Sequence, residues 1–411
     1  MQVVYNRCAG LDVHKKTVVA CVITPKSPSG WHKQIRAFTT MTQDLLKLSD
    51  WLTSHDCTHV AMESTGEYWR PVFNILEGNF EVMLVNARHI KAVPGRKTDI
   101  KDSQWIAELL QHGLLRASFI PPVEQRDLRD LTRHRSNFIR ERVNLVNRVQ
   151  KVLEAANIKL ASVASDVMGV SGRAMLVAIV EGSASPELMA DLAKGTMRKK
   201  HDLLIQALEG RVRPHQRFIL AQLLCQIDSI DETIKCFDQQ IEEYCRPFEQ
   251  AVDLIDTIPG IARRTAEIIV SEIGMDMSRF PSAEHLAAWA GVAPGNHESA
   301  GKTLSTSTRK GNRSLRTILV QAAHALARTK TYLAAQFRRI SGRRGKKRAA
   351  VAVAHSILTI AYHLISRQEP YKDLGADYFD KQRPESVKKR LVKRLEKLGY
   401  QVNLEPVPVA N

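Results

Sequence analysis

Short apolar runs alternate with amphipathic stretches between residues 7 and 115 of this 411-residue chain. Four of the five runs are rich in valine, isoleucine, alanine and methionine, as buried strands are. We predict strands over residues 7–13, 17–23, 31–39, 59–63 and 80–85. We predict helices over residues 44–54, 67–76 and 99–110, with Thr98 as the N-cap of the last. Three strands, a helix and then alternating strands and helices indicate an α/β domain over residues 1–120.

The middle of the chain carries an apolar seam whose spacing alternates three and four residues without a break. Its members are Leu220, Leu223, Ile227, Ile230, Ile234, Phe237, Ile241 and Tyr244. This spacing predicts a coiled-coil helix. The seam can pair within the chain, against residues 128–153, or between chains. We favour pairing between chains, which predicts a dimer or tetramer.

The charge of the chain points to a polyanionic partner. The formal net charge is +17 and the isoelectric point about 9.7, and the basic residues lie along the whole chain and not on one amphipathic anchor. That distribution favours nucleic acid over a membrane surface. Residues 126–151 hold eight Lys or Arg against three acids. We interpret that stretch as a helix facing nucleic acid, although a solvated helix face would have the same composition.

Other classes of protein do not fit the sequence. We find no run of about 18 apolar residues and no apolar signal-peptide core, so we expect neither a membrane span nor secretion. The six cysteines are scattered, with no C-x-x-C pair and no histidine at zinc spacing. We therefore expect four or five of them to be core fillers or incidental surface thiols in a reducing cytosol. A DNA-binding role would associate the chain with the bacterial nucleoid.

Four acids stand where predicted strands end or a predicted helix begins. Asp12 ends the first strand, Glu63 ends the fourth, and Asp99 and Asp102 lie three residues apart at a helix start. Each alone could be a turn or helix-start residue. Carboxylates at the ends of adjacent parallel strands, joined by two from one helix face, can converge on one or two hard cations. We expect Mg²⁺ (or Mn²⁺), which in pairs clamps the attacking and leaving oxygens of a phosphodiester.

The segments around these acids resemble a known family. GLDVHKKTVVACV, MESTGEYWRPVFNIL and VNARHIKAVPGRKTDIKDSQWIAELLQHGLL are similar to the amino-terminal, RuvC-like domain of the insertion-sequence family one-ten transposases. These are also called DEDD transposases or bridge-RNA-guided recombinases. The resemblance implies a ribonuclease-H-like core, which the element order also matches, and Asp12, Glu63, Asp99 and Asp102 as metal ligands. It also implies a guide RNA encoded by the element.

The carboxy-terminal half contains a predicted helical hairpin at LIDTIPGIARRTAEIIVSEIG, residues 254–274. It resembles a helix-hairpin-helix, in which a tight turn offers backbone N–H groups to a phosphate. Gly260, Arg263 and Arg264 are the predicted contacts. The second position after the hairpin glycine is usually glycine and is Ala262 here, which leaves a plain helical hairpin as the alternative.

A polar stretch follows and resembles the family's carboxy-terminal transposase domain. In the family, a serine just before the glycine of this loop is the nucleophile, and Ser299 occupies that place, although the pattern here is Ser-Ala-Gly where many relatives have Ser-Gly. Ser305 and Ser307 are nearby competitors. Basic side chains around it are predicted to hold nucleic acid: Lys302, Arg309, Lys310, Arg313 and Arg316. The implied reaction is attack on a phosphodiester, a phosphoserine intermediate and rejoining to a new strand.

The predicted organisation has four parts. They are a RuvC-like catalytic domain (1–120), a basic helix and coiled-coil region for oligomerisation (121–250), an all-α transposase domain (251–368) and a basic tail (369–411). The predicted function is a transposase or site-specific recombinase of a bacterial insertion sequence. The alternatives are a metal-only junction nuclease, in which Ser299 is structural, and a non-catalytic nucleic-acid-binding protein.

Overall fold

The computed structural model describes residues 2–26, 28–64, 66–86, 102–182, 184–295, 297–299, 302–305, 307–308, 310–382 and 384–404. The chain divides into two compact units, Met1–Pro121 and Pro122–Asn411. The finer divisions predicted at residues 250 and 368 stay predictions.

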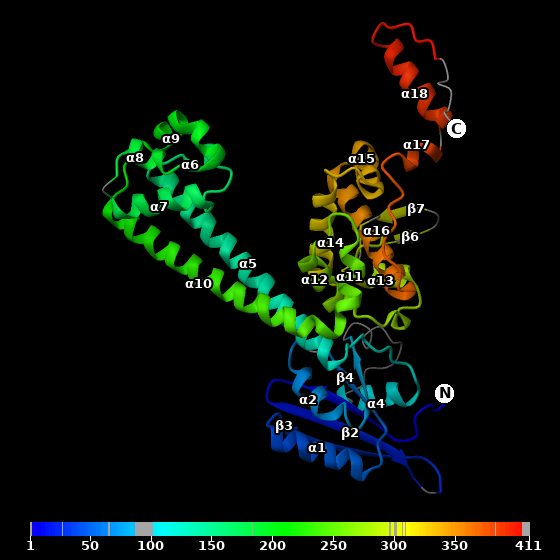
Figure 1. The fold of residues 1–411 in the computed structure, drawn as a ribbon. Helices are drawn as coiled ribbons and strands as arrows, with labels where there is room; N and C mark the ends of the chain where they lie inside the picture. Colours follow the sequence, from blue (N-terminus) through cyan, green and yellow to red (C-terminus); the bar gives the residue numbers. More distant parts are fainter. Residues whose placement is uncertain are drawn as a thin grey trace. The chain divides into compact units, whose positions relative to one another are not determined.

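The first unit is built on a five-stranded mixed sheet (Figure 1). The strand order is β3-β2-β1-β4-β5: β1, β2 and β3 pair antiparallel, whereas β1, β4 and β5 run parallel. The elements are β1 (Cys8–Val13), β2 (Thr17–Pro25), β3 (Trp31–Thr39), α1 (Thr42–Ser54), β4 (His59–Glu63), α2 (Trp69–Leu76), β5 (Glu81–Val85) and α4 (Asp102–Gln111).

Helices cover both faces of the sheet because its central strands are apolar on both sides. Alternate residues of a strand point to opposite faces. Leu11 of β1 and Met62 of β4 pack with α1 and α2, whereas Cys8 and Ala61 face the other way and pack with α4. This is the three-layer arrangement expected of parallel strands. The predicted strands and helices of this unit are confirmed where described; Thr98, Asp99 and the rest of residues 87–101 lie outside the described residues.

The described part of the second unit is helical apart from one short hairpin. Its longer elements are α5 (Val123–Ala155), α7 (Val170–Glu181), α9 (His201–Leu208), α10 (Pro214–Cys245), α11 (Glu249–Asp256), α12 (Arg263–Ile273), α13 (Ala283–Ala290), α14 (Arg313–Leu326), α15 (Tyr332–Arg344), α16 (Lys346–Arg367) and α18 (Pro384–Glu396). Its shorter elements are α6 (Leu160–Val163), α8 (Pro186–Asp191), α17 (Tyr378–Gln382), β6 (His297–Ser299), β7 (Lys302–Ser305) and the 3-10 turns Gly195–Lys200, Arg246–Phe248 and Met277–Arg279.

The predicted seam packs within the chain. Helices α5 and α10 lie side by side and antiparallel, since Arg135 pairs with Asp238 and Arg142 with Asp231 (Figure 1). The seam residues of the first half of α10, Leu220, Leu223 and Ile227, are buried in a cluster with the end of α5 and with α6–α9. Our preference for pairing between chains was therefore wrong for these residues. At the other end of the seam, Tyr244 is 41 % exposed and Cys245 is buried instead.

Helix α16 is the central helix of the carboxy-terminal cluster. It contacts α11, α13, α14 and α15, and its buried face includes Val353, Ile357 and Ala361. By length and composition alone it could cross a membrane. Our expectation that no such apolar run exists was therefore wrong, although these contacts are those of a core helix.

Candidate functional site

Asp12 and Glu63 stand at the carboxyl ends of neighbouring parallel strands. In the register of β1 and β4, Leu11 lies opposite Met62, so Asp12 and Glu63 occupy the next step. Ala9 and Leu11 alternate with Gly10 and Asp12, and Ala61 precedes Glu63 by two residues. Both carboxylates therefore point to the face that α4 covers. The two strands bring these acids to one edge, as predicted.

Helix α4 brings Asp102 to the same edge. A Cβ atom at Gly10 would lie 2.3 Å from the carbonyl oxygen of Ser103 and 2.3 Å from the amide nitrogen of Ala107. The first turns of α4 thus rest directly on the β1 backbone. The far end of α4 meets the start of the chain, where the Val4 amide donates to the Gln111 carbonyl at 2.8 Å. Helix α4 therefore runs opposite to β1, and Asp102 lies at the Asp12 end.

The donor chemistry of this edge suits a hard cation, since carboxylate oxygens are what Mg²⁺ prefers. Within the described residues, however, no three Asp, Glu, His or Cys side chains are grouped closely enough to hold a metal ion. The fourth predicted ligand, Asp99, is outside that description. The full four-acid site stays a prediction.

His14 is a neighbour of the acids that sequence reasoning missed. Its Nε2 lies 3.1 Å from Oδ2 of Asp12, and its side chain is 59 % exposed. The signal was present in the segment DVH, because two residues apart on an extended chain means the same face.

The predicted serine loop is a two-stranded hairpin, β6 paired antiparallel with β7. Ser299 ends β6 opposite Lys302, the first residue of β7. The hairpin is closed at its base by a bridge between Pro294 and Thr308. The hydroxyl of Ser299 is outside the described part of the structure, as are the side chain of Lys302 and all of Arg309.

The helical hairpin at α11 and α12 is present, but its arginines face carboxylates of the same chain. Arg263 lies 2.8 Å from Glu249, and this hydrogen bond raises the pKa of Arg263. Arg264 lies 2.9 Å from the buried Glu267. Gly260 has φ +83°, and a Cβ there would lie 2.6 Å from Leu326, so packing already requires glycine at this position. Nucleic-acid binding at this turn stays a prediction.

The base of the serine hairpin is tied to α5 through Glu272 of α12, a connection that the sequence did not reveal. Glu272 is fully buried and accepts two hydrogen bonds from Arg133, at 2.8 and 2.9 Å. Arg129 lies 3.3 Å away. Asn312 donates to the same carboxylate at 2.6 Å while its own oxygen caps α14. A single buried charge therefore joins α5, α12 and the segment that follows the hairpin.

Three of the predicted basic contacts lie in the same segment, close to Asn312 in sequence. Lys310 and Arg313 are exposed and Arg316 is half-buried. Asn312 stands between the first two, so their backbone is fixed by the contact with Glu272. These side chains are placed to meet a polyanion near the hairpin, although binding itself stays a prediction.

Comparisons with known proteins agree with this architecture. A family model described as a transposase, of the DEDD IS110 type, matches residues 9–158. A second, described as the transposase IS116/IS110/IS902 family, matches residues 252–338. The first match includes Asp12, Glu63, Asp99 and Asp102, and the second includes Ser299.

Individual relatives cover most of the chain. The transposase for insertion sequence element IS1111A of Coxiella burnetii is 27 % identical over 323 residues, 76 % of this chain and 79 % of the relative. The pilin gene-inverting protein of Moraxella lacunata is 25 % identical over 386 residues, 88 % of this chain and 96 % of the relative. Both matching models describe one transposase family and occur in order along the chain. The chain therefore belongs to the IS110 family of transposases, enzymes that act on DNA.

Proposed function

We propose that this transposase cuts and rejoins DNA with Ser299 as nucleophile and with a divalent cation held by Asp12, Glu63, Asp99 and Asp102. The observation that supports the proposal is the placement of three acids along one sheet edge: two in register on parallel strands, and one at the start of the helix that rests on Gly10. The mixed sheet, with an antiparallel hairpin beside parallel strands, supports a RuvC-like core. A cation there would neutralise charge on a phosphodiester.

The serine chemistry conserves the phosphodiester bond. The Ser299 oxygen attacks phosphorus and gives up its proton, an Oγ–P bond forms, and the bond from phosphorus to a DNA hydroxyl oxygen breaks. A second DNA end then attacks the same phosphorus, and the Ser299 hydroxyl is restored. A serine hydroxyl is a weak nucleophile and needs a base. The position of Ser299 at the end of a short strand suits a group that must reach a strand of DNA.

Trapping the covalent intermediate tests the nucleophile. With a phosphorothiolate substrate, the unchanged protein should give a protein–DNA adduct on a denaturing gel, mapped to the peptide that holds Ser299. Ser299→Ala should abolish the adduct, while Ser305→Ala, the matched control on β7, should retain it. Cleavage by Ser299→Ala without any adduct would transfer the reaction to the metal-only nuclease mechanism.

Substitution of Asp12 tests the acid edge. Asp12→Asn should abolish recombination in Mg²⁺ and leave the melting temperature close to that of the unchanged protein, because removing one of several like charges relieves repulsion. Asp50→Asn, at an exposed position of α1, is the control. Recombination by Asp12→Asn at the control's rate would remove Asp12 from the site.

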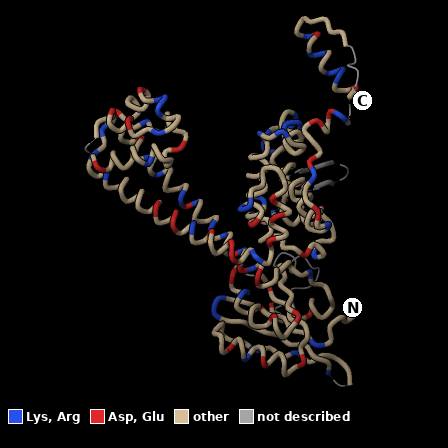
Figure 2. Tube along the Cα trace, viewed as in Figure 1, with Lys and Arg blue, Asp and Glu red and all other residues tan. Residues whose placement is uncertain are grey.

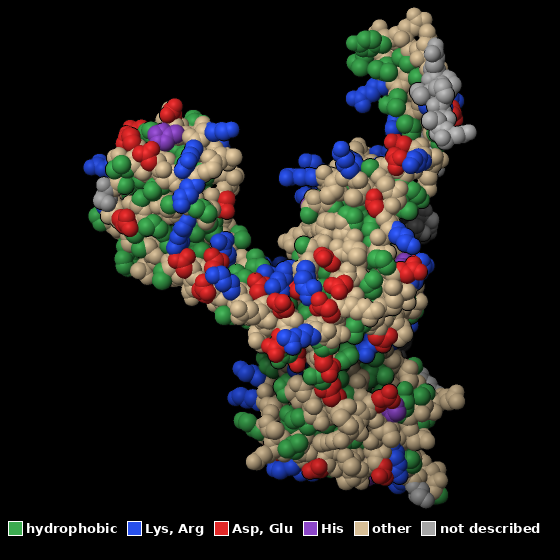
Figure 3. Space-filling view, in the orientation of Figure 1, with side chains coloured by type: hydrophobic (Ala, Val, Ile, Leu, Met, Phe, Trp, Pro, Cys, Tyr) green, Lys and Arg blue, Asp and Glu red, His purple; other side chains and the backbone are tan. Residues whose placement is uncertain are grey.

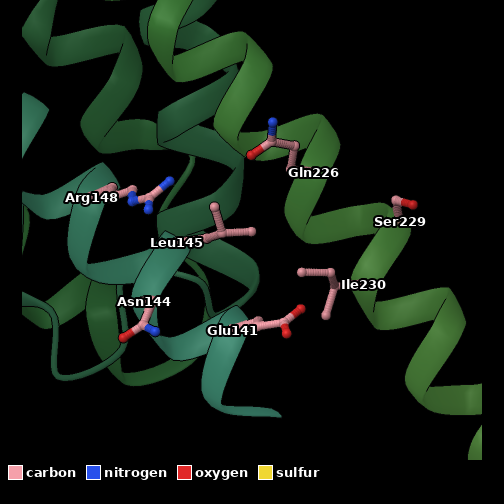
Figure 4. A pocket seen from close by; sticks show the side chains of 7 residues that line it. All are labelled: Glu141, Asn144, Leu145, Arg148, Gln226, Ser229 and Ile230. Atoms are coloured by element: carbon pink, nitrogen blue, oxygen red, sulfur yellow. The ribbon is translucent and has the colours of Figure 1, made fainter. Parts of the chain in front are cut away.

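The α5–α10 pair is incompletely filled in its central part. A cavity of about 380 Å³ opens between the two helices, with Leu145 and Ile230 as its apolar side chains (Figure 4). The other lining residues are polar or charged: Glu141, Asn144, Arg148, Gln226 and Ser229. Apolar side chains that border such a gap can be covered further by a partner.

Assembly is therefore part of the proposal. The central part of the α5–α10 pair exposes Ile139 and Val143, at 37 and 50 %, and leaves Ile230 half-buried. We propose that a second copy covers these side chains. Ile230→Lys with Ile234→Lys should then lower the mass in light scattering. An unchanged mass would confine the seam to one chain.

The proposal that the protein binds a guide RNA rests on the family resemblance alone. Sequencing the nucleic acid that co-purifies with the protein tests it directly. Recovery of an RNA transcribed from the end of the element supports guidance, and recovery of random cellular RNA argues against it.

A further inference from the structure

The end of α15 and the start of α16 concentrate positive charge on residues that are assigned neither to the proposed cation site nor to the serine hairpin. Seven of the eleven residues from 338 to 348 are basic, none is acidic, and all seven are exposed. They are Arg338, Arg339, Arg343, Arg344, Lys346, Lys347 and Arg348. Figure 2 shows Lys and Arg gathered along this turn, and Figure 3 shows basic side chains standing out from the surface over α15. We call residues 338–348 the basic corner.

Among the described residues, no ion pair neutralises the charge of the basic corner. Arg338 donates to the Thr329 carbonyl at 3.0 Å, and Arg339 lies over the ring of Phe379 at 5.0 Å. For the other five, no carboxylate of the described residues lies within ion-pairing distance. Like charges this close repel one another, and a polyanion would relieve that repulsion.

The backbone under these side chains is fixed. Leu333 and Phe337 of α15 and Val353 of α16 are buried, and Gln336 donates to the Ser356 hydroxyl at 3.0 Å across the helix pair. Gly345 joins the two helices with φ +83° and precedes the first turn of α16. The first N–H groups of that 22-residue helix add partial positive charge at the same place.

A cavity of about 420 Å³ opens beside the basic corner, lined by Arg339, Ile340, Arg343, Arg344, Phe379 and Gln382. The ring of Phe379 already contacts other side chains, because it stacks on Tyr332 at 5.3 Å and lies 5.0 Å from the guanidinium of Arg339. Phe379 is the one aromatic residue of this lining, so the cavity keeps no free ring for a base to stack on. The corner is therefore built to meet charge, as phosphate contacts are, and not to distinguish bases.

We infer that the basic corner binds the sugar–phosphate backbone of nucleic acid without reading its sequence. The inference rests on the chain acting on DNA, and not on the roles proposed for Ser299 or the acids. An anionic membrane is the competing partner. Residues 338–348 include no exposed apolar side chain to insert, since Ile340 is half-buried, and so nucleic acid is favoured.

Salt-dependent binding tests the inference with the full chain. The test variant combines Arg343→Gln, Arg344→Gln and Lys347→Gln. The control combines Lys194→Gln, Lys199→Gln and Arg211→Gln, which removes the same charge from other positions of the same unit. Probes are a duplex DNA of arbitrary sequence, a structured RNA and vesicles of anionic phospholipid. Melting temperatures verify that both variants fold.

We expect the slope of log Kd against log salt to become shallower by about 0.9 for each phosphate that the protein no longer neutralises, so by nearly three in the test variant. The control should keep the slope of the unchanged protein. A change with DNA alone or with RNA alone identifies the source of the backbone.

Equal slopes for the test variant and the control on both nucleic acids would overturn the inference, as would an effect confined to vesicles. Because no cleavage is measured, failure of the Ser299 adduct experiment leaves this result untouched.

Discussion

Two basic regions of the second unit differ in how far their positive charges are paired with carboxylates of the described residues. Helix α5 has eight Lys or Arg between residues 126 and 151, but Arg133, Arg135 and Arg142 each contact a carboxylate from α10 or α12. The basic corner has seven basic residues among eleven, a higher density of positive charge, and it has no carboxylate partner among the described residues. Sequence composition therefore measures how much charge a helix has, whereas the fold decides how much of it a ligand can reach.

The partners of α5 explain why composition was insufficient. They lie 89 to 139 residues away along the chain, at Asp231, Asp238 and Glu272. No local pattern such as i,i+4 spacing reports such a contact. The nucleic-acid-facing role predicted for α5 stays a prediction. Its candidates are now the exposed side chains without a carboxylate partner in the described structure, Arg140, Arg148 and Lys151.

The largest effect should come from Glu272→Gln. The variant leaves Arg129 and Arg133 of α5 without the buried negative charge that they contact, and breaking such a pair costs about 3–5 kcal/mol in the free energy of unfolding. Urea denaturation measures the decrease. A change below about 1 kcal/mol would show that Glu272 does not hold the charges of Arg129 and Arg133. Pairing with a carboxylate would then not distinguish α5 from the basic corner.

The same carboxylate should make stability depend on pH. Burial raises the pKa of Glu272, but the hydrogen bond from Arg133 and the charges of Arg129 and Arg133 lower it more, so the pKa lies below the ordinary 4.5. A pKa depressed in the folded state gives stability that is complete above the unfolded value and lost as pH falls through the folded one. The unfolding free energy should therefore decline at acid pH, and Glu272→Gln should decline less. Parallel curves for the two proteins would contradict this.

The smallest effect separates the two regions directly. Arg142→Gln breaks a two-point contact with Asp231, at 2.5 and 3.1 Å, in a pair about one third exposed, and should cost roughly 0.2–1 kcal/mol. Arg343→Gln removes a side chain without an ion pair to the described residues and should leave the melting temperature unchanged. DNA affinity should show the reverse order. If Arg142→Gln weakened DNA binding more than Arg343→Gln, the comparison would be wrong.

The sequence was most informative where the physical signal is local. The strands of the first unit follow largely from short apolar runs, and the positions of Asp12 and Glu63 follow from where two of those runs end. The sequence also placed Asp102 near the start of its helix. The serine segment was predicted as a loop and is a hairpin. The prediction missed its two strands because strands of three and four residues are too short to show a period of two.

The sequence was least informative where a contact joins distant segments. The seam from Leu220 to Ile227 could be recognised, and residues 128–153 were one of its two candidate partners. The choice between that segment and a second chain could not be made, since an apolar stripe packs equally well against either. The link from Glu272 to Asn312 was also missed, because a buried acid is indistinguishable in sequence from an exposed one.

The contact at Gly10 bears on how this protein tolerates mutation. Helix α4 rests on β1 through main-chain atoms, with 2.3 Å left for a Cβ, so even alanine would force the two elements apart. The spacing between Asp12 and Asp102 is thus set by two backbones and not by the sizes of the surrounding side chains. A library that varies Ile106 or Leu109 should yield folded members that differ in stability while retaining the geometry of the acids. Position 10 should admit a single residue in any such screen.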